Sequence, residues 1–330
     1  MDSKIKFAVL GLGNIGKRHL ETIRQHPSCQ LVAVCDTVKP QNLNLDVPFY
    51  DKLDVMLSEV SECAVVNICT PNGFHAAHAN KCIEAGKHVV IEKPMALHKS
   101  DAEKVIFNAL KYNVKVFCVM QNRLTPVARY LKHLIETDQL GEIIELSIVL
   151  NWNRGPSYFN TDGHAHVWRG KKLLDGGPLF TQFSHFIDLI YWTVGDINVF
   201  SVQKKNLMHP FVPEIEDCGV VSFGFGTNGI GSLYYSINAP KGNIMSQVTI
   251  TGKQGAIRIE GQYLEEIKYL STRDNFTLPN FGSDLIDGHY KVMDNVVHSI
   301  LNQKAIETNA LEGMKVVEII EKIYNFGTGI

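Results

Sequence analysis

The sequence lacks the features that mark membrane proteins and nucleic-acid-binding proteins. Its 330 residues contain no uncharged apolar run of the roughly 18 residues that a membrane-spanning helix needs. The 34 acidic and 32 basic residues leave a net charge of −2, so there is no excess of positive charge for nucleic acid or an anionic membrane. No signal-peptide core precedes the first apolar run. We therefore expect a cytoplasmic protein with neither kind of partner.

Metal-binding patterns are also scarce. The seven cysteines, an odd number, include no Cys-x-x-Cys pair, and several stand in apolar runs, where cysteine acts as a small hydrophobe. His164 and His166 could lie on one side of a strand near His185, but no cysteine or carboxylate cluster completes a zinc site. We expect reduced, buried thiols and no bound metal.

A glycine-rich turn follows the first apolar run, residues 7–10, and opens a segment with helical spacing. In this context a Gly-x-Gly-x-x-Gly pattern predicts a dinucleotide site. The first glycine allows a tight turn, the second lets the backbone approach a pyrophosphate, and the third lets helix and strand pack closely. The helix N-terminus attracts the anion. The expected cofactor contacts are Gly11, Gly13, Asn14, Ile15 and Gly16.

Asp36 ends a second predicted strand, residues 31–36, about 20 residues beyond the glycines, where a carboxylate binds a ribose 2′-hydroxyl. Because this carboxylate would repel a 2′-phosphate and no arginine follows it directly, the sequence predicts NAD rather than NADP. A glycine-rich turn with an unrelated strand-end aspartate is the alternative.

Short apolar runs continue to alternate with helical segments up to residue 121. Runs at 64–69, 88–91 and 114–119 enclose helical patterns at 74–85 and 100–112. Continuous apolar strands separated by helices predict a doubly wound parallel sheet, the Rossmann arrangement. We assign residues 1–121 to this domain.

Beyond residue 121 the pattern has period two, which predicts an open, mainly antiparallel sheet covered by helices. The expected strands are 143–152, 218–225, 230–238 and 246–259, and the expected covering helices are 180–192 and 290–301. The amphipathic run 311–324 could pack on either domain. We assign residues 122–330 to a second, α+β domain for substrate binding and oligomerisation.

One stretch of the second domain puts polar residues into an apolar helical pattern. Thr181, His185 and Asp188 fall on one face of a predicted helix from Leu179 to Trp192. His185 is the candidate general base, because histidine has the unperturbed pKa nearest to neutral pH. Asp175 is the second candidate, although a residue before two glycines could instead be a cap. A core histidine with a carboxylate neighbour is the alternative.

The chain resembles the Gfo/Idh/MocA (glucose-fructose oxidoreductase / inositol dehydrogenase) family over essentially its whole length. The resemblance is carried by the glycine pattern, by Thr70-Pro71-Asn72 with His75, by Glu92-Lys93-Pro94, and by Gly176-Gly177 followed by His185. It implies an NAD-dependent dehydrogenase acting on a CH–OH group, in which Lys93 contacts both the nicotinamide region and the substrate. Further cofactor contacts are then Thr70, Pro71, Asn72, His75, Glu92 and Gln121.

The sequence leaves part of this site open. A helix-start turn would also explain Pro71 and Asn72, and a surface lysine beside a glutamate would also explain Lys93. The family usually has an aspartate four residues before the histidine, and here that position is Thr181, so an Asp–His pair does not carry over. Whether Pro94 is cis is not fixed by the sequence.

Segments around 121–123, 151–154, 168–170 and 175–182 are similar to those of a branch of the family, the UDP-N-acetyl-2-amino-2-deoxyglucuronate dehydrogenases. This resemblance implies oxidation of the C3 hydroxyl of a UDP-linked N-acetyl-aminosugar uronate to a ketone, for bacterial surface polysaccharide such as O-antigen. If NADH stays bound, a 2-oxoacid would be the second oxidant. Expected substrate contacts are Lys93, Arg123, Asn153, Arg154, Asp175, Thr181, Gln182 and His185.

Two other hypotheses stay open. The first keeps the fold but takes a free sugar, inositol or another polyol as substrate. The second is a non-catalytic NAD(H)-sensing protein, which would have no use for the pair Lys93 and His185. Because an open sheet with alternating strands needs a cover, we also expect a homotetramer with the sheet of residues 142–270 at an interface.

Overall fold

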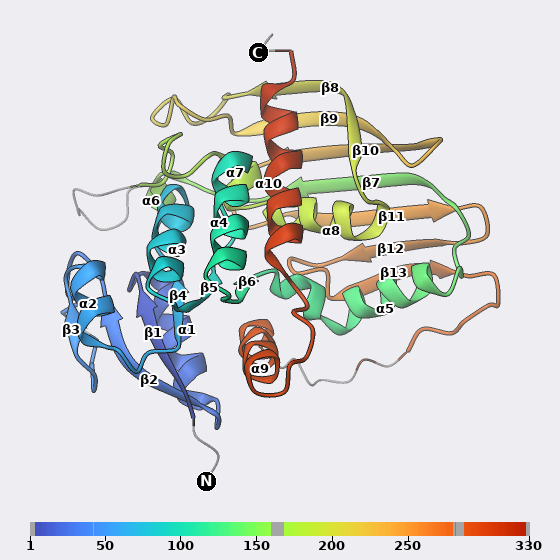
Figure 1. The fold of residues 1–330 in the computed structure, drawn as a ribbon. Coiled ribbons are helices and arrows are strands. Elements are labelled where there is room, and N and C mark those ends of the chain that lie inside the picture. Colours follow the sequence, from blue (N-terminus) through green and yellow to red (C-terminus); the bar gives the residue numbers. More distant parts are fainter. Residues whose placement is uncertain (1–3, 42, 160–167, 280, 282–286, 328–330) are drawn as a thin grey trace. The chain divides into compact units, whose positions relative to one another are not determined.

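The computed structural model describes residues 4–41, 43–159, 168–279, 281 and 287–327. The chain forms two compact units, the first from residues 1–121 and 286–317 and the second from residues 122–285 and 318–330. Each unit is built around its own sheet (Figure 1). Within the described ranges, no helix is long and apolar enough to cross a membrane.

The first unit contains a six-stranded parallel sheet in the order β3-β2-β1-β4-β5-β6. This is the doubly wound order, so the predicted Rossmann sheet is confirmed. The order reverses beside β1, and ligands of such sheets bind outside the carboxyl ends of the strands at that point. The strands are β1 (Ile5–Leu10), β2 (Cys29–Cys35), β3 (Phe49–Tyr50), β4 (Val65–Ile68), β5 (His88–Ile91) and β6 (Val116–Cys118).

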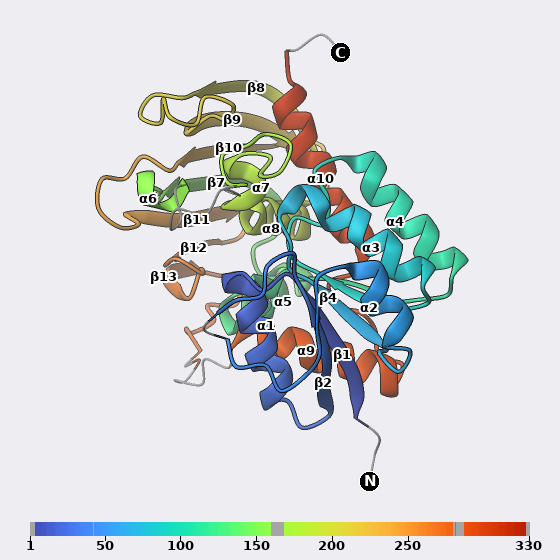
Figure 2. The ribbon, with the colours of Figure 1, turned by 90° about the vertical axis from the view of Figure 1, so that its left-hand side faces the viewer.

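Helices lie on both faces of this sheet. Helix α1 (Asn14–Gln25) and α9 (Gly288–Leu301) pack together on one face, and α3 (His75–Glu84) and α4 (Lys99–Lys111) lie on the other (Figure 2). The unit also includes α2 (Leu53–Glu59), the 3₁₀ turn η1 (Asn72–Phe74) and the first half of α10 (Ala310–Asn325).

The placement of residues 286–317 differs from the expected division at residue 121. This segment belongs to the first unit, because α9 packs on α1 and the next segment pairs with β6. The backbone N–H of Cys118 donates to the carbonyl of Thr308 at 2.9 Å, and Phe117 forms an antiparallel bridge with Asn309. Helical periodicity shows that one face of α9 is buried, but it does not show which sheet covers that face.

The second unit contains a seven-stranded mixed sheet in the order β13-β12-β11-β7-β10-β9-β8. Among these strands β7 and β10 pair in parallel, and the other neighbours are antiparallel, which confirms the predicted mainly antiparallel sheet. The strands are β7 (Ile143–Asn151), β8 (Ile197–Lys205), β9 (Cys218–Phe225), β10 (Gly229–Ser236), β11 (Met245–Gly252), β12 (Ala256–Glu260) and β13 (Glu266–Ser271).

Helices α5 (Pro126–Glu136) and α8 (Ser184–Val194) cover one face of this sheet (Figure 1). The rings of Trp152, Phe183 and Tyr235 meet edge to face between helix and sheet. The second unit also contains α6 (Pro156–Phe159) and α7 (Pro178–Thr181). The 3₁₀ turn η2 (Gln121–Leu124) spans the division between the two units.

The single helix expected from Leu179 to Trp192 is wrong. It is two helices, α7 and α8, interrupted at Gln182 and Phe183. The Phe183 side chain is fully buried in the aromatic cluster, so the apolar pattern continues across the break. Thr181 and His185 therefore do not share one continuous helical face.

Candidate active site

The glycine turn has the backbone geometry that a pyrophosphate site requires. Gly11 has φ +93°, and a Cβ there would lie 2.6 Å from the carbonyl oxygen of Cys69. A Cβ on Gly16 would lie 1.9 Å from the carbonyl oxygen of Gly11. Among the residues that the structure describes, no atom beyond Gly13 and its two chain neighbours lies within 4 Å of a Cβ placed on Gly13, so the backbone there is open to a ligand at the start of α1. These residues fit a dinucleotide.

Asp36 lies directly beside this turn, at the end of β2. Its carboxylate accepts hydrogen bonds from the backbone N–H of Leu12 and, at 3.4 Å, from that of Val38. The carboxylate therefore stabilises the glycine turn in addition to the ribose contact that we predict for it.

Lys93 follows β5 in the loop Glu92-Lys93-Pro94, at the carboxyl edge of the parallel sheet. Its side chain is half-buried, and the Lys93–Pro94 peptide is cis. The backbone N–H of Lys93 donates to Oε2 of Glu92 at 3.1 Å. The carboxylate of Glu92 thus faces its own loop instead of solvent.

His75 joins this loop to the Thr70-Pro71-Asn72 turn. Its Nδ1 lies 2.7 Å from the carbonyl oxygen of Pro94, and its Nε2 lies 2.6 Å from that of Thr70. Burial lowers the pKa of His75, and the two carbonyl groups partly offset this effect. Asn72 is buried in η1. His75 thus links two loops at the carboxyl edge of the sheet. Contacts of these residues and of Gln121 with a cofactor stay predictions.

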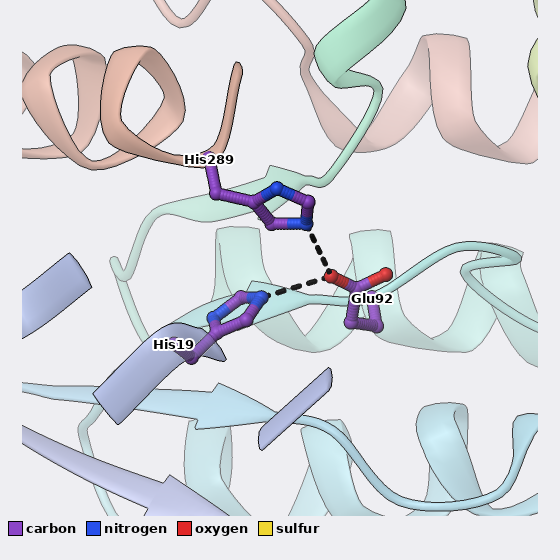
Figure 3. Close-up of side chains that lie close together, drawn as sticks. All are labelled: His19, Glu92 and His289. Atoms are coloured by element: carbon purple, nitrogen blue, oxygen red, sulfur yellow. Dashed lines mark hydrogen bonds and ion pairs between the residues drawn. The ribbon is translucent and has the colours of Figure 1, made fainter. Parts of the chain in front are cut away.

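Glu92 lies in a buried cluster with His19 and His289 (Figure 3). The Oε1 atom of Glu92 lies 2.8 Å from Nε2 of His19, on α1, and 3.6 Å from Nε2 of His289, on α9. One ligand atom from each residue lies within 4.8 Å of the others, which is close enough to hold a metal ion. Neither histidine was expected in the site from the sequence.

In the second unit, Asp175 stabilises the turn before α7. It is 1% exposed, and its carboxylate accepts hydrogen bonds from the backbone N–H groups of Gly170 at 2.8 Å and Gly177 at 3.2 Å, and from the Thr181 hydroxyl. Burial raises the pKa of Asp175, and these donors oppose that rise. This environment favours a structural carboxylate over a general base.

His185 lies in the first turn of α8 and is 8% exposed. Gln182, at the break between α7 and α8, donates through Nε2 to the hydroxyl of Tyr158 at 2.8 Å. The same segment therefore carries the candidate base and a polar contact to α6.

Two arginines meet on Tyr158. Cζ of Arg169 lies 4.4 Å from the centre of the Tyr158 ring, and Cζ of Arg154 lies 5.2 Å from it and 4.9 Å from the ring of Trp152. Burial lowers the pKa of Arg154, and neighbouring Arg169 adds to this. A bound anion would relieve the repulsion between the two guanidinium groups.

The other two expected substrate contacts have intramolecular partners. Arg123 is 4% exposed and forms a two-point ion pair with Asp188. Asn153 donates its side-chain amide to the carbonyl of Ala239 and forms an isolated bridge with Asn238. These contacts favour structural roles. His164 and His166 lie outside the described residues.

Family models match almost the whole chain. The model of the Gfo/Idh/MocA oxidoreductase family described as an NAD-binding Rossmann fold matches residues 5–120, and that of its C-terminal alpha/beta domain matches residues 132–325. The chain belongs to the Gfo/Idh/MocA oxidoreductase family. Its first domain is accordingly NAD-binding, as the glycine turn predicts.

Several solved structures and relatives of this Gfo/Idh/MocA protein cover nearly its full length. The WlbA dehydrogenase from Bordetella pertussis, in complex with NADH and UDP-GlcNAcA, is 29% identical with a TM-score of 0.88, and the match covers 99% of this chain and 97% of that one. The WlbA dehydrogenase from Chromobacterium violaceum is 29% identical with a TM-score of 0.86, covering 98% and 94%. D-glucoside 3-dehydrogenase from Escherichia coli (strain K12) is 24% identical over 98% of this chain and 95% of its own length.

Several residues of the contacts described above, in one unit or the other, were not expected from the sequence. His19 stands three residues after Gly16, and its position on the glycine-turn helix was a usable signal. His289 had none, because nothing in the pattern connects α9 with the loop that carries Lys93. The same holds for Tyr158, which lies in a four-residue helix with no periodic pattern.

Proposed function

We propose that this protein is an NAD-dependent dehydrogenase that oxidises the C3 hydroxyl of a UDP-linked N-acetyl-aminosugar uronate to a 3-keto sugar. The observation that carries the substrate class is the pair Arg154 and Arg169 on Tyr158, which Gln182 joins to the segment bearing His185. Stacked guanidinium groups recognise carboxylate and diphosphate oxygens. The likeness to WlbA dehydrogenases in complex with NADH and UDP-GlcNAcA supports the same substrate.

The reaction converts an alcohol and NAD⁺ into a ketone, NADH and a proton. Bound NAD would supply the acceptor for the hydride of C3. The imidazole of His185 takes the hydroxyl proton, and the ammonium of Lys93 stabilises the developing alkoxide. Asp175 and Thr181 hold the turn that leads to His185.

We place the reaction in the cytoplasm, in the synthesis of bacterial surface polysaccharide precursors, and we propose NAD as the preferred cofactor because of Asp36. We also propose a homotetramer in which a neighbouring subunit covers the open face of the second sheet. The outward side chains of that sheet include Val220, Ile230 and Tyr234, which are 48%, 56% and 39% exposed.

The function is tested by following NADH absorbance with UDP-N-acetylglucosaminuronate, UDP-N-acetylglucosamine, a free glucoside and inositol, each with and without a 2-oxoacid. We expect the charged nucleotide sugar to give the highest kcat/KM. A stimulation by the 2-oxoacid would indicate that NADH is recycled in place. Faster oxidation of the glucoside or inositol would contradict the proposed substrate.

A second arm separates binding from chemistry. Because Arg154 would grip the anion alike in the ground and transition states, Arg154→Ala should raise KM while kcat holds. Arg273→Ala is the control, since this exposed arginine belongs to the same unit but forms its ion pair with Asp138. If the Arg154 variant handles the charged substrate as the parent does, the substrate of this dehydrogenase is uncharged.

A further inference from the structure

Both carboxylate oxygens of Glu92 are in use, on opposite sides of the group. Oε2 accepts the backbone N–H of Lys93 at 3.1 Å. Oε1 accepts a hydrogen bond from His19 Nε2 at 2.8 Å and lies 3.6 Å from His289 Nε2. Glu92 therefore connects the loop that carries Lys93 to two helices distant in sequence (Figure 3).

His289 lies between two carboxylates. Its Nε2 faces Glu92, and its Nδ1 lies 3.4 Å from Oδ1 of Asp287. Asp287 caps α9 and forms an ion pair with Arg18 at 2.7 Å. Each nitrogen of the buried ring therefore faces a carboxylate oxygen, one from the loop of Lys93 and one from the start of α9.

His19 is held from its other side. Its Nδ1 lies 2.8 Å from the side-chain amide of Asn67, on β4, which fixes the ring while Nε2 faces Glu92. Burial opposes the charged form of Glu92, but the contacts with His19 and His289 hold its pKa well below the usual range. The carboxylate is thus charged and has a fixed orientation.

We propose that His19 and His289 are positioning residues that act through Glu92 to fix the backbone and ammonium group of Lys93. This inference rests on the proposed role of Lys93 in the reaction. The chain of contacts runs from α1, which begins at the glycine turn, through Glu92 to α9. The same helix that presents the cofactor-binding turn therefore also anchors the loop of Lys93.

The kinetic test compares variants that keep or remove the contact. Glutamine places an amide nitrogen near the position of a histidine Nε2, so His19→Gln should keep most of kcat. His19→Leu and His289→Leu should lower kcat about tenfold, as expected for a misplaced catalytic group. Neither should change KM for NAD more than about twofold. In a Lys93→Ala background the same substitutions should have no further effect on kcat.

His26→Leu is the matched control. His26 follows the same helix α1, is 4% exposed and lies 3.5 Å from Asp294 on the same helix α9, and its ring contacts Ser28 and Tyr290 instead of Glu92. We expect this variant to lower the melting temperature without lowering kcat. If His19→Leu and His289→Leu behave as it does, their role is structural and the proposal is wrong.

A substrate-free measurement separates this proposal from the proposed function. Trace acetylation of amines, followed by peptide mass spectrometry, compares Lys93 with Lys81, whose ammonium pairs with exposed Asp54. The rate at Lys93 relative to Lys81 should change by about threefold or more in the leucine variants. His289→Gln and Glu92→Gln provide the same comparison where a leucine variant does not fold.

The outcomes are distinct. A changed acetylation rate at Lys93 in a protein that oxidises none of the tested alcohols would support the positioning and overturn the proposed function. An unchanged acetylation rate at Lys93 together with an unchanged kcat in the leucine variants would overturn the proposed positioning role of His19 and His289. Stoichiometric zinc in the purified protein, lost in Glu92→Gln, would also overturn it, because the three side chains would then be metal ligands.

Discussion

Arg123 donates two hydrogen bonds to Asp188, from Nε to Oδ2 at 2.7 Å and from Nη2 to Oδ1 at 2.6 Å. Both side chains are buried, with 4% and 2% exposed. Arg123→Met would leave a buried carboxylate without its partner, so we expect the free energy of unfolding to fall by about 3–5 kcal/mol. Urea unfolding measures this change.

The double variant Arg123→Met/Asp188→Leu is the control. Removing both charges together should recover most of the lost stability, because no unpaired charge is left. A near-normal stability of Arg123→Met combined with a raised KM would instead show that Arg123 binds substrate.

A second prediction separates the two candidate bases. His185→Ala should lower kcat by about 10²-fold or more, whereas Asp175→Asn should lower stability by about 1–3 kcal/mol, because it replaces an acceptor of buried N–H groups. Steady-state kinetics and unfolding of both variants check this. Near-normal kcat for His185→Ala would rule out His185 as the base and leave Asp175 as the base to test.

The pKa of Asp175 gives this prediction a pH dependence. A carboxyl whose folded pKa is raised stabilises most below its unfolded pKa, and this stability declines as pH rises through the folded pKa. The asparagine variant cannot titrate there. Its deficit relative to the parent should therefore shrink as pH rises above about 4. A deficit that grows with pH would show that the pKa is lowered.

The third prediction concerns the cofactor. Asp36→Asn removes the charge but keeps an oxygen that can accept the Leu12 N–H, whereas Asp36→Ala removes both. We expect kcat/KM of the parent to be higher with NAD than with NADP. In both variants the ratio of these two kcat/KM values should be smaller than in the parent. Asp36→Ala should also weaken NAD binding more than Asp36→Asn does. Equal use of the two cofactors by the parent would refute the proposed preference.

The fourth prediction concerns the open face of the second sheet. Tyr234 pairs with Val220 on β9 and Val149 on β7, which forms a row of apolar outward side chains. Tyr234→Glu should dissociate the proposed tetramer in light scattering at micromolar concentration, because it would bury a charge at the interface. Leu110→Glu, on the exposed side of α4 at 78% exposure, is the control. A monomeric parent would contradict the proposal.

The sheets could be predicted from sequence because their strands carry the periodicity that burial imposes. The runs at 64–69, 88–91 and 114–119 are continuous because both faces of the parallel sheet are covered, and β9 and β10 alternate because one face is open. The prediction of one strand over 246–259 is wrong. The structure has two antiparallel strands there, β11 and β12, joined by a turn that contains Gly255, where backbone atoms of Ser271 leave no room for a side chain.

The site was less predictable, because its decisive contacts join segments distant in sequence. Glycine spacing located the nucleotide turn, since the backbone alone determines it. The roles of Arg123 and Asp175 depend on partners that no local pattern shows, Asp188 in one case and the N–H groups of Gly170 and Gly177 in the other. The grouping of His19 with His289 likewise appears when α9 is packed on α1.

The most direct test of the proposed reaction is a single turnover with UDP-N-acetylglucosaminuronate deuterated at C3, followed by mass spectrometry of the reduced cofactor and the sugar. We expect the deuterium to appear in NADH and the sugar to be recovered as a 3-keto product, with both signals lost in Lys93→Ala and His185→Ala. NADH without deuterium, or no reduction of NAD by this substrate, would contradict the proposed oxidation at C3.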